Sequence, residues 1–289
     1  MERKRQLRML LKLRAKGLLI TNFGVCIVIT IIMQAIPMLG GYAAGLVLPP
    51  TNELLYAPDI SVYYPQMLRF YSIILGVTML ASPLTMGAYA WFSALSMLRR
   101  PRIREAFNWL GDLHLTLKAF GATLWFAGIC LAWAIAFLGL PVATVLFVSA
   151  KGKAMAVGSI LFLSGLIALL TIAGIILTVV RAYSYLPALF VLAAHPDMHI
   201  REAFRECGLF MAGRRWEFME LVLSFVGWFL LESFTCGLVT LYVRPYFNLS
   251  VLSFAQQARG AWLLENGKAC MDTVWTPNNS IHEEDGMDV

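Results

Sequence analysis

Three charged residues, Arg181, Glu232 and Arg244, interrupt long apolar segments of the chain. A charge in an apolar segment is costly to place in hydrocarbon, so it marks a candidate site for an ion or a lipid headgroup. Glu232 lies a few residues before the Cys236-Gly237 turn and Arg244 a few residues after it, so we expect the two to be close. One interpretation is an anion or headgroup site anchored by the two arginines, with Glu232 as counter-ion. The alternative is a structural ion pair beside an arginine that extends to the membrane interface.

Signatures of metal binding and catalysis are weak or missing in the sequence. His195 and His199 have the spacing of two ligands on a helix, but Pro196 lies between them and no third ligand is evident. No phosphate-binding loop, G-x-S-x-G elbow or H-E-x-x-H pattern occurs, and the five cysteines form no C-x-x-C pair. We therefore expect no metal, no cofactor and no catalytic residue, and an enzyme is the class with the least support.

The pentapeptide Ile-Arg-Glu-Ala-Phe occurs twice, at 103–107 and 200–204, each time in a charged stretch between apolar segments. Its first and last residues are four positions apart, so they share one face of an α-helix. Such a face predicts docking to the membrane surface, with docking to a cytoplasmic partner as the alternative. The four candidate residues are Ile103, Phe107, Ile200 and Phe204.

The composition identifies the environment of these residues. Hydrophobic residues make up 59% of the chain and charged residues 14%, and the mean hydropathy is +0.71. Apolar runs of about 20 residues match the thickness of a bilayer, so the chain is predicted to be an integral membrane protein. The net charge of +6 comes mainly from basic residues between apolar runs. That distribution indicates membrane topology and argues against a nucleic-acid partner.

The apolar segments predict an all-α, polytopic membrane protein with six transmembrane helices. The predicted spans cover about 18–39, 70–98, 119–146, 154–194, 217–235 and 238–263. The fourth is about twice as long as a bilayer requires, so we expect it to break, with Pro187 as the kink. Three charged segments, near 1–17, 102–118 and 197–216, are predicted to form amphipathic cytoplasmic helices. The first, rich in Arg and Lys, suits the surface of an anionic membrane.

The order of these segments predicts a repeated unit of one amphipathic helix, a span out and a span back. The units cover about 1–98, 99–194 and 195–264, and together they form one membrane domain. Basic residues on one side place both termini in the cytoplasm. The polar segment 265–289 is predicted to be a disordered cytoplasmic tail.

Short elements in the last third of the chain resemble a bacterial integral-membrane family catalogued as domain of unknown function 975. The elements are AGRRW at 212–216, LSFVGW at 223–228, TCG at 235–237 and PY at 245–246, together with RAKGLL at 14–19 near the start. Phe254-Ala255 departs from the family pattern, which often has Phe-Tyr. The resemblance covers most of 1–262 and implies a six-helix membrane domain without an assigned activity.

Two functions stay open from the sequence. The repeated surface helices favour a non-catalytic scaffold or accessory component of the bacterial cytoplasmic membrane, with a membrane-protein partner or a second copy of the chain. The alternative is a protein that binds or transports a lipid or another amphiphile. This alternative rests on Arg181, Arg244 and Glu232, and on the long loop at 40–67. Either protein would contact anionic lipids at the cytoplasmic face.

Overall fold

The computed structural model describes residues 2–46, 64–97, 101–151, 157–235 and 237–267. Every regular element in these ranges is helical. Most of the long predicted loop and of the predicted disordered tail lies outside the described residues. The elements are α1 (Glu2–Thr21), α2 (Phe23–Gly45), α4 (Tyr64–Ser96), the 3₁₀ helix η2 (Ile103–Phe107), α5 (Asn108–Gly111), α6 (Leu113–Lys151), α7 (Val157–Tyr183), α8 (Leu186–Ala194), α9 (Ile200–Phe210), α10 (Arg215–Leu223), α11 (Val226–Phe234) and α12 (Thr240–Glu265).

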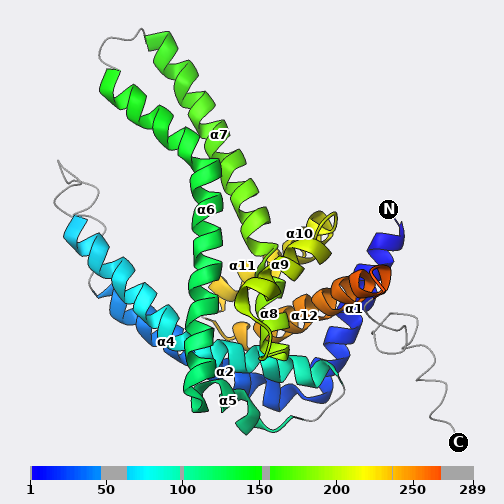
Figure 1. The fold of residues 1–289 in the computed structure, drawn as a ribbon. Helices are drawn as coiled ribbons and strands as arrows, with labels where there is room; N and C mark the ends of the chain where they lie inside the picture. Colours follow the sequence, from blue (N-terminus) through cyan, green and yellow to red (C-terminus); the bar gives the residue numbers. More distant parts are fainter. Residues whose placement is uncertain (1, 47–63, 98–100, 152–156, 236, 268–289) are drawn as a thin grey trace, which may run out of the picture.

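Four helical segments in the described ranges are long and apolar enough to cross a bilayer: Phe23–Gly45, Pro65–Ser96, Leu113–Thr144 and Phe162–Ala194. They form two hairpins, α2 with α4 and α6 with α7, which diverge from a common base (Figure 1). Large apolar side chains on the second hairpin are exposed, including Leu131 at 61% and Ile172 at 61%. Surfaces of this length and composition are compatible with lipid and not with water.

The predicted fifth and sixth spans have a different character from these four segments. The fifth is divided into α10 and α11, of nine residues each, by a break at Ser224 and Phe225. The sixth corresponds to α12, whose sequence includes Arg244, Asn248 and Arg259. Helix α12 packs on α1 in the base and also contacts α2 and α4 of the first hairpin (Figure 1).

The break predicted in the fourth apolar segment is confirmed. Helix α7 ends at Tyr183 and α8 begins at Leu186, so a short turn divides the segment. Pro187 lies in the first turn of α8. Proline is tolerated there because the first N–H groups of a helix have no intrahelical acceptor. The proline therefore starts a new helix instead of bending a continuous one.

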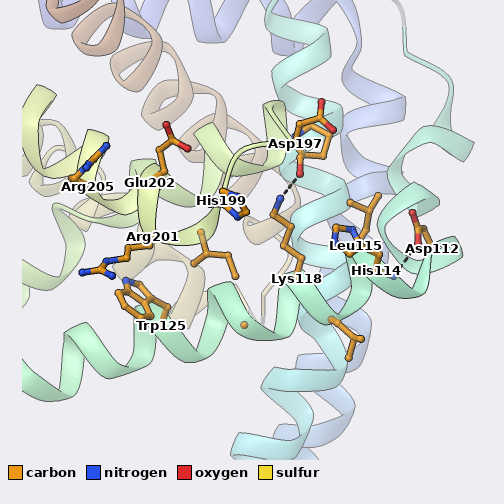
Figure 2. A pocket seen from close by; sticks show the side chains of 14 residues that line it. Asp112, His114, Leu115, Lys118, Trp125, Asp197, His199, Arg201, Glu202 and Arg205 are labelled. Carbon is orange, nitrogen blue, oxygen red and sulfur yellow. Dashed lines mark hydrogen bonds between the residues drawn. The ribbon is translucent and has the colours of Figure 1, made fainter.

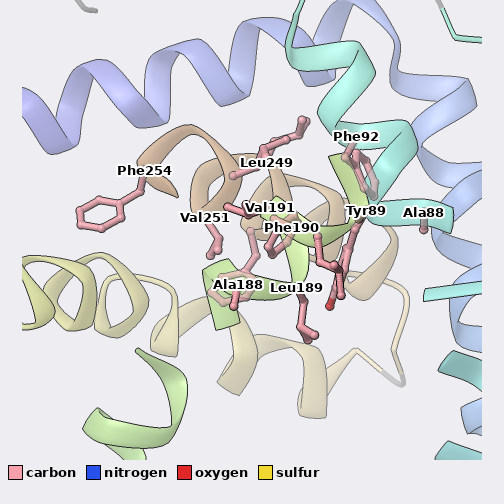
Figure 3. Close-up of a cluster of buried hydrophobic side chains, with 14 of the residues drawn as sticks. Ala88, Tyr89, Phe92, Ala188, Leu189, Phe190, Val191, Leu249, Val251 and Phe254 are labelled. Atoms are coloured by element: carbon pink, nitrogen blue, oxygen red, sulfur yellow. The ribbon is translucent and has the colours of Figure 1, made fainter. Parts of the chain in front are cut away.

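The buried core lies in the base, where α4, α8 and α12 meet (Figure 3). Tyr89 of α4 packs on Phe190 of α8, with 4.1 Å between ring centroids. Leu249 and Phe254 of α12 are buried in the same cluster. Close packing of large side chains from three distant segments stabilises the base as one unit.

Helix α1 belongs to this base. Its residues Leu11, Ala15 and Leu19 are fully buried, and α1 packs lengthwise on α12. Their spacing of four residues makes one continuous stripe along the helix. The sequence pattern suggested that the apolar residues of this helix face the membrane. The structure instead directs this stripe, the inner stripe, toward the protein.

The first pentapeptide forms a 3₁₀ helix, η2, where the sequence pattern led us to expect an α-helical face. With three residues per turn, Ile103 and Phe107 no longer share a face. Ala106 is the residue directed inward, and its backbone lies against Gly87 of α4. The contact leaves no space for a side chain: a Cβ at Gly87 would lie 1.8 Å from the carbonyl oxygen of Ala106.

Candidate functional site

An open groove of about 1520 Å³ lies at one side of the base, between the first turns of α6 and the segment that leads into α9 (Figure 2). One wall runs from the end of the second charged stretch into the predicted third span, and the other belongs mainly to the third charged stretch. The residues that line it are Asp112, His114, Leu115, Leu117, Lys118, Gly121, Trp125, Pro196, Asp197, His199, Ile200, Arg201, Glu202 and Arg205.

Local interactions hold the two walls in place. The Asp112 carboxylate accepts a hydrogen bond from the backbone N–H of His114 at 2.9 Å, which satisfies a free donor at the start of α6. The Lys118 ammonium donates to the carbonyl oxygen of Pro196 and so connects the walls directly. Gly121 lets Ile200 approach α6 closely, since a Cβ there would lie 3.0 Å from Ile200 Cδ1.

Charges of both signs lie along the groove, with Glu202 beside Arg205 at one end and Lys118 near Asp197 (Figure 2). Arg201 and Arg205 lie on the outer side of α9, and Arg201 projects next to Trp125 (Figure 2). Asp112 lies at the opposite end of the view. An aromatic ring beside Arg201, with carboxylates such as Glu202 and Asp112 along the groove, can bind a ligand that carries both charge and apolar surface.

A polar network adjoins the groove between α9, α12 and the end of α8. Arg259 Nε donates to Glu206 Oε2 at 3.2 Å, and Arg259 Nη1 lies 2.8 Å from His195 Nε2. Arginine has no acceptor, so His195 Nε2 must accept this bond and the imidazole must be neutral, with its proton on Nδ1. Burial, followed by the charge of Arg259, lowers the pKa of His195 below its usual value of 6.5.

This network predicts a pH dependence of stability. Because folding lowers the pKa of His195, neutral His195 contributes stability above the unfolded-state pKa, and this contribution is lost as the pH falls below about 6.5. The thermal unfolding temperature of wild type should therefore drop more between about pH 7.5 and pH 5.5 than that of His195→Gln, whose neutral amide can still accept from Arg259. Parallel pH profiles for the two proteins would contradict this assignment.

The residues singled out in the apolar segments lie away from the groove lining. Glu232 Oε1 and Arg244 Nη2 are 3.4 Å apart, so their predicted proximity is confirmed. The Arg244 side chain is 43% exposed and also lies over the Phe229 ring, 5.6 Å from its centroid. Arg181 instead lies over Trp133 of α6 at 5.0 Å. Each arginine therefore has its own aromatic neighbour, and their joint role in one anion site stays a prediction.

The pentapeptide residues are divided between surface and core. Ile103 and Phe107 keep exposed side chains, at 38% and 37%. Ile200 is half-buried in the groove wall, and Phe204 is buried near Phe126 and Tyr185, with ring centroids 6.5 Å away in both pairs. Two sequence signals lay near the groove: the second pentapeptide, which contains Arg201 and Glu202, and the spacing of His195 and His199, of which His199 lines the groove. The other groove residues were not identified from the sequence.

The fold defines a helical multi-pass membrane protein with a charged groove at its base. Within the described ranges, no cluster of three or more His, Cys, Asp or Glu residues could hold a metal ion. A family model described as "Protein of unknown function (DUF975)" matches residues 1–261, and the chain therefore belongs to that family. This match confirms the resemblance seen in the short sequence elements. Neither the curated proteins nor the solved structures include a match to this chain.

Proposed function

We propose that this protein is a non-catalytic membrane scaffold that binds a partner polypeptide in the groove between α6 and α9. The observation that carries the proposal is the groove itself, an open depression lined by charges of both signs from two distant segments. Small-molecule sites usually measure about 300–1,000 Å³ and enclose their ligand. This groove is larger, at about 1520 Å³, and open along one side, which suits an extended segment of protein.

The side chains of the groove favour a polypeptide ligand for a second reason. Trp125 and the two arginines at one end resemble the aromatic and arginine anchors that contribute most at protein interfaces. Asp112 and Asp197 at the other end can receive basic side chains or N–H groups of the same partner.

The proposal places the base on the cytoplasmic side of a bacterial inner membrane. Its support is the positive-inside rule applied to the exposed basic residues Arg102, Arg104, Arg201 and Arg205. The number of membrane crossings does not change this orientation. Four spans, or six with α10–α11 and α12 included, are both even numbers, so both put the two ends of the domain on the same side.

The repeat is also part of the proposal. The three returning segments of the sequence pattern correspond to the end of α4, to the α7–α8 junction and to α12. Contacts among α4, α8 and α12 form the core of the base. A protein assembled from three related units would bring its equivalent segments together in this way.

Lipid or amphiphile handling is the second candidate function. Arg244, at 43% exposure, has the lipophilic surroundings and the free surface that a headgroup site needs. Arg181 over Trp133 offers a similar site on the α6–α7 hairpin. Both arginines would then bind an anionic headgroup next to an aromatic ring.

Photocrosslinking in native membranes distinguishes the two functions. A photoreactive amino acid is placed at position 125, in the groove, and at position 104, exposed in the base but outside the groove. We expect position 125, and not position 104, to yield a discrete protein adduct. Equal yields from both positions, or none from position 125, would contradict the scaffold. A phospholipid adduct at position 125 would favour lipid handling.

A further inference from the structure

Helix α1 has a second apolar face, opposite the stripe that packs on α12. Met9, Leu13 and Ile20 are exposed at 54%, 56% and 62%. At 3.6 residues per turn these three positions fall within a narrow strip, the outer stripe, on the side of the helix away from Leu11 and Ala15. We propose that the outer stripe is an interfacial binding site for anionic phospholipids, independent of the partner groove.

The outer stripe cannot turn inward, because α1 is fixed to three other helices. Arg8 Nη1 lies 2.9 Å from Glu220 Oε2 of α10, and Arg14 Nη2 donates to the carbonyl oxygen of Ser96 in α4 at 2.8 Å. The fully buried inner stripe faces α12. Rotation of α1 would break these contacts, so the exposure of the outer stripe is a fixed property of the fold.

The connection between α1 and α2 places this face at the bilayer boundary. Only Asn22 separates the end of α1 at Thr21 from the start of the membrane-spanning helix at Phe23. The last turn of α1, which contains Ile20, therefore lies where the chain enters hydrocarbon. An apolar strip held at this depth is buried in the boundary between headgroups and acyl chains.

The charge of α1 selects acidic headgroups. Its sequence contains seven basic residues, Arg3, Lys4, Arg5, Arg8, Lys12, Arg14 and Lys16, against the single acidic residue Glu2. Arg8 and Arg14 among them already bind within the protein. Lys16 is exposed beside the outer stripe. A basic helix with an apolar strip is the chemistry that binds anionic leaflets, because apolar burial and electrostatic attraction add. The covalent connection of α1 to α2 already holds this face at the bilayer. An acidic protein or a second copy of the chain would therefore have to displace lipid to bind here.

Fluorescence quenching of the full-length protein tests the site. An environment-sensitive fluorescent amino acid is introduced at position 13, and at position 104 as an exposed control away from α1. Each protein is placed in nanodiscs of phosphatidylcholine alone or with phosphatidylglycerol. We expect brominated lipid to quench position 13 at least about twofold and iodide to quench it weakly, with the reverse at position 104. Phosphatidylglycerol should increase the lipid quenching, and Lys16→Gln should weaken this dependence by roughly fivefold.

Each other outcome overturns the proposal. Strong quenching of position 13 by iodide would show that the outer stripe faces water. Protection from both quenchers would show a protein cover, either a partner or a second copy. Equal lipid quenching in the two nanodisc compositions would remove the preference for acidic headgroups. Thermal unfolding of each labelled protein verifies that the base remains folded.

Discussion

Gly87→Ala is expected to destabilise the protein by about 3 kcal/mol, the upper end of the usual cost of overpacking that shifts the backbone. The added Cβ would lie 1.8 Å from the carbonyl oxygen of Ala106 and 2.9 Å from its carbonyl carbon. Backbone atoms cannot move aside as a flexible side chain can. Moreover, η2 is held nearby by Trp91, whose Nε1–H donates to the carbonyl oxygen of Pro101 at 3.3 Å. Helix α4 and η2 must therefore separate.

Gly76→Ala is the matched control on the same helix. A Cβ at Gly76 meets nothing within 4 Å, so this substitution adds helix propensity without a clash. It should stabilise the protein by about 0.5–1 kcal/mol. The two alanine variants are therefore expected to shift the thermal unfolding temperature in detergent in opposite directions. Similar unfolding temperatures for both variants would show that η2 does not pack on α4 as described.

The helical membrane fold could be predicted because its signals are local. Apolar runs mark the spans, and Pro187 marks the start of a helix, so the break near it could be expected from the sequence. The contact between Glu232 and Arg244 could also be expected, because a short turn separates their segments. The family elements near the C-terminus agree with the match over residues 1–261.

Other features depend on contacts between distant segments and were missed. The two pentapeptides are identical, yet 103–107 forms a 3₁₀ helix and 200–204 begins an α-helix. The difference comes from their surroundings: η2 is pressed against Gly87, whereas α9 continues for 11 residues with a buried stripe of its own. Sequence identity therefore did not determine the local conformation.

The groove and the two apolar faces of α1 could not be predicted from the sequence for the same reason. Lys118 and Arg201 belong to charged stretches that are far apart in the chain, and only the fold brings them to opposite walls. In α1, apolar residues cover two faces, and a sequence pattern does not tell which face meets protein. The buried positions Leu11, Ala15 and Leu19 are identified only by their packing against α12.

Reversal of two positive charges at the end of the groove near Trp125 tests the central claim, the binding of a partner polypeptide, most directly. Arg201→Glu with Arg205→Glu, combined with the photoreactive residue at position 125, should lower the yield of the protein adduct about tenfold or more. Both arginines are exposed, so the substitutions leave the core intact. The matched control is Arg102→Glu with Arg104→Glu, two exposed arginines of the base outside the groove lining.

The measurement is the adduct yield of the groove variant relative to the control variant, in membranes that contain equal amounts of each protein. A yield of about one tenth or less in the groove variant, with the control near wild type, is the result predicted by a polypeptide bound along the groove. An unchanged yield in the groove variant, or an equal loss in the control, would contradict the groove as the binding site.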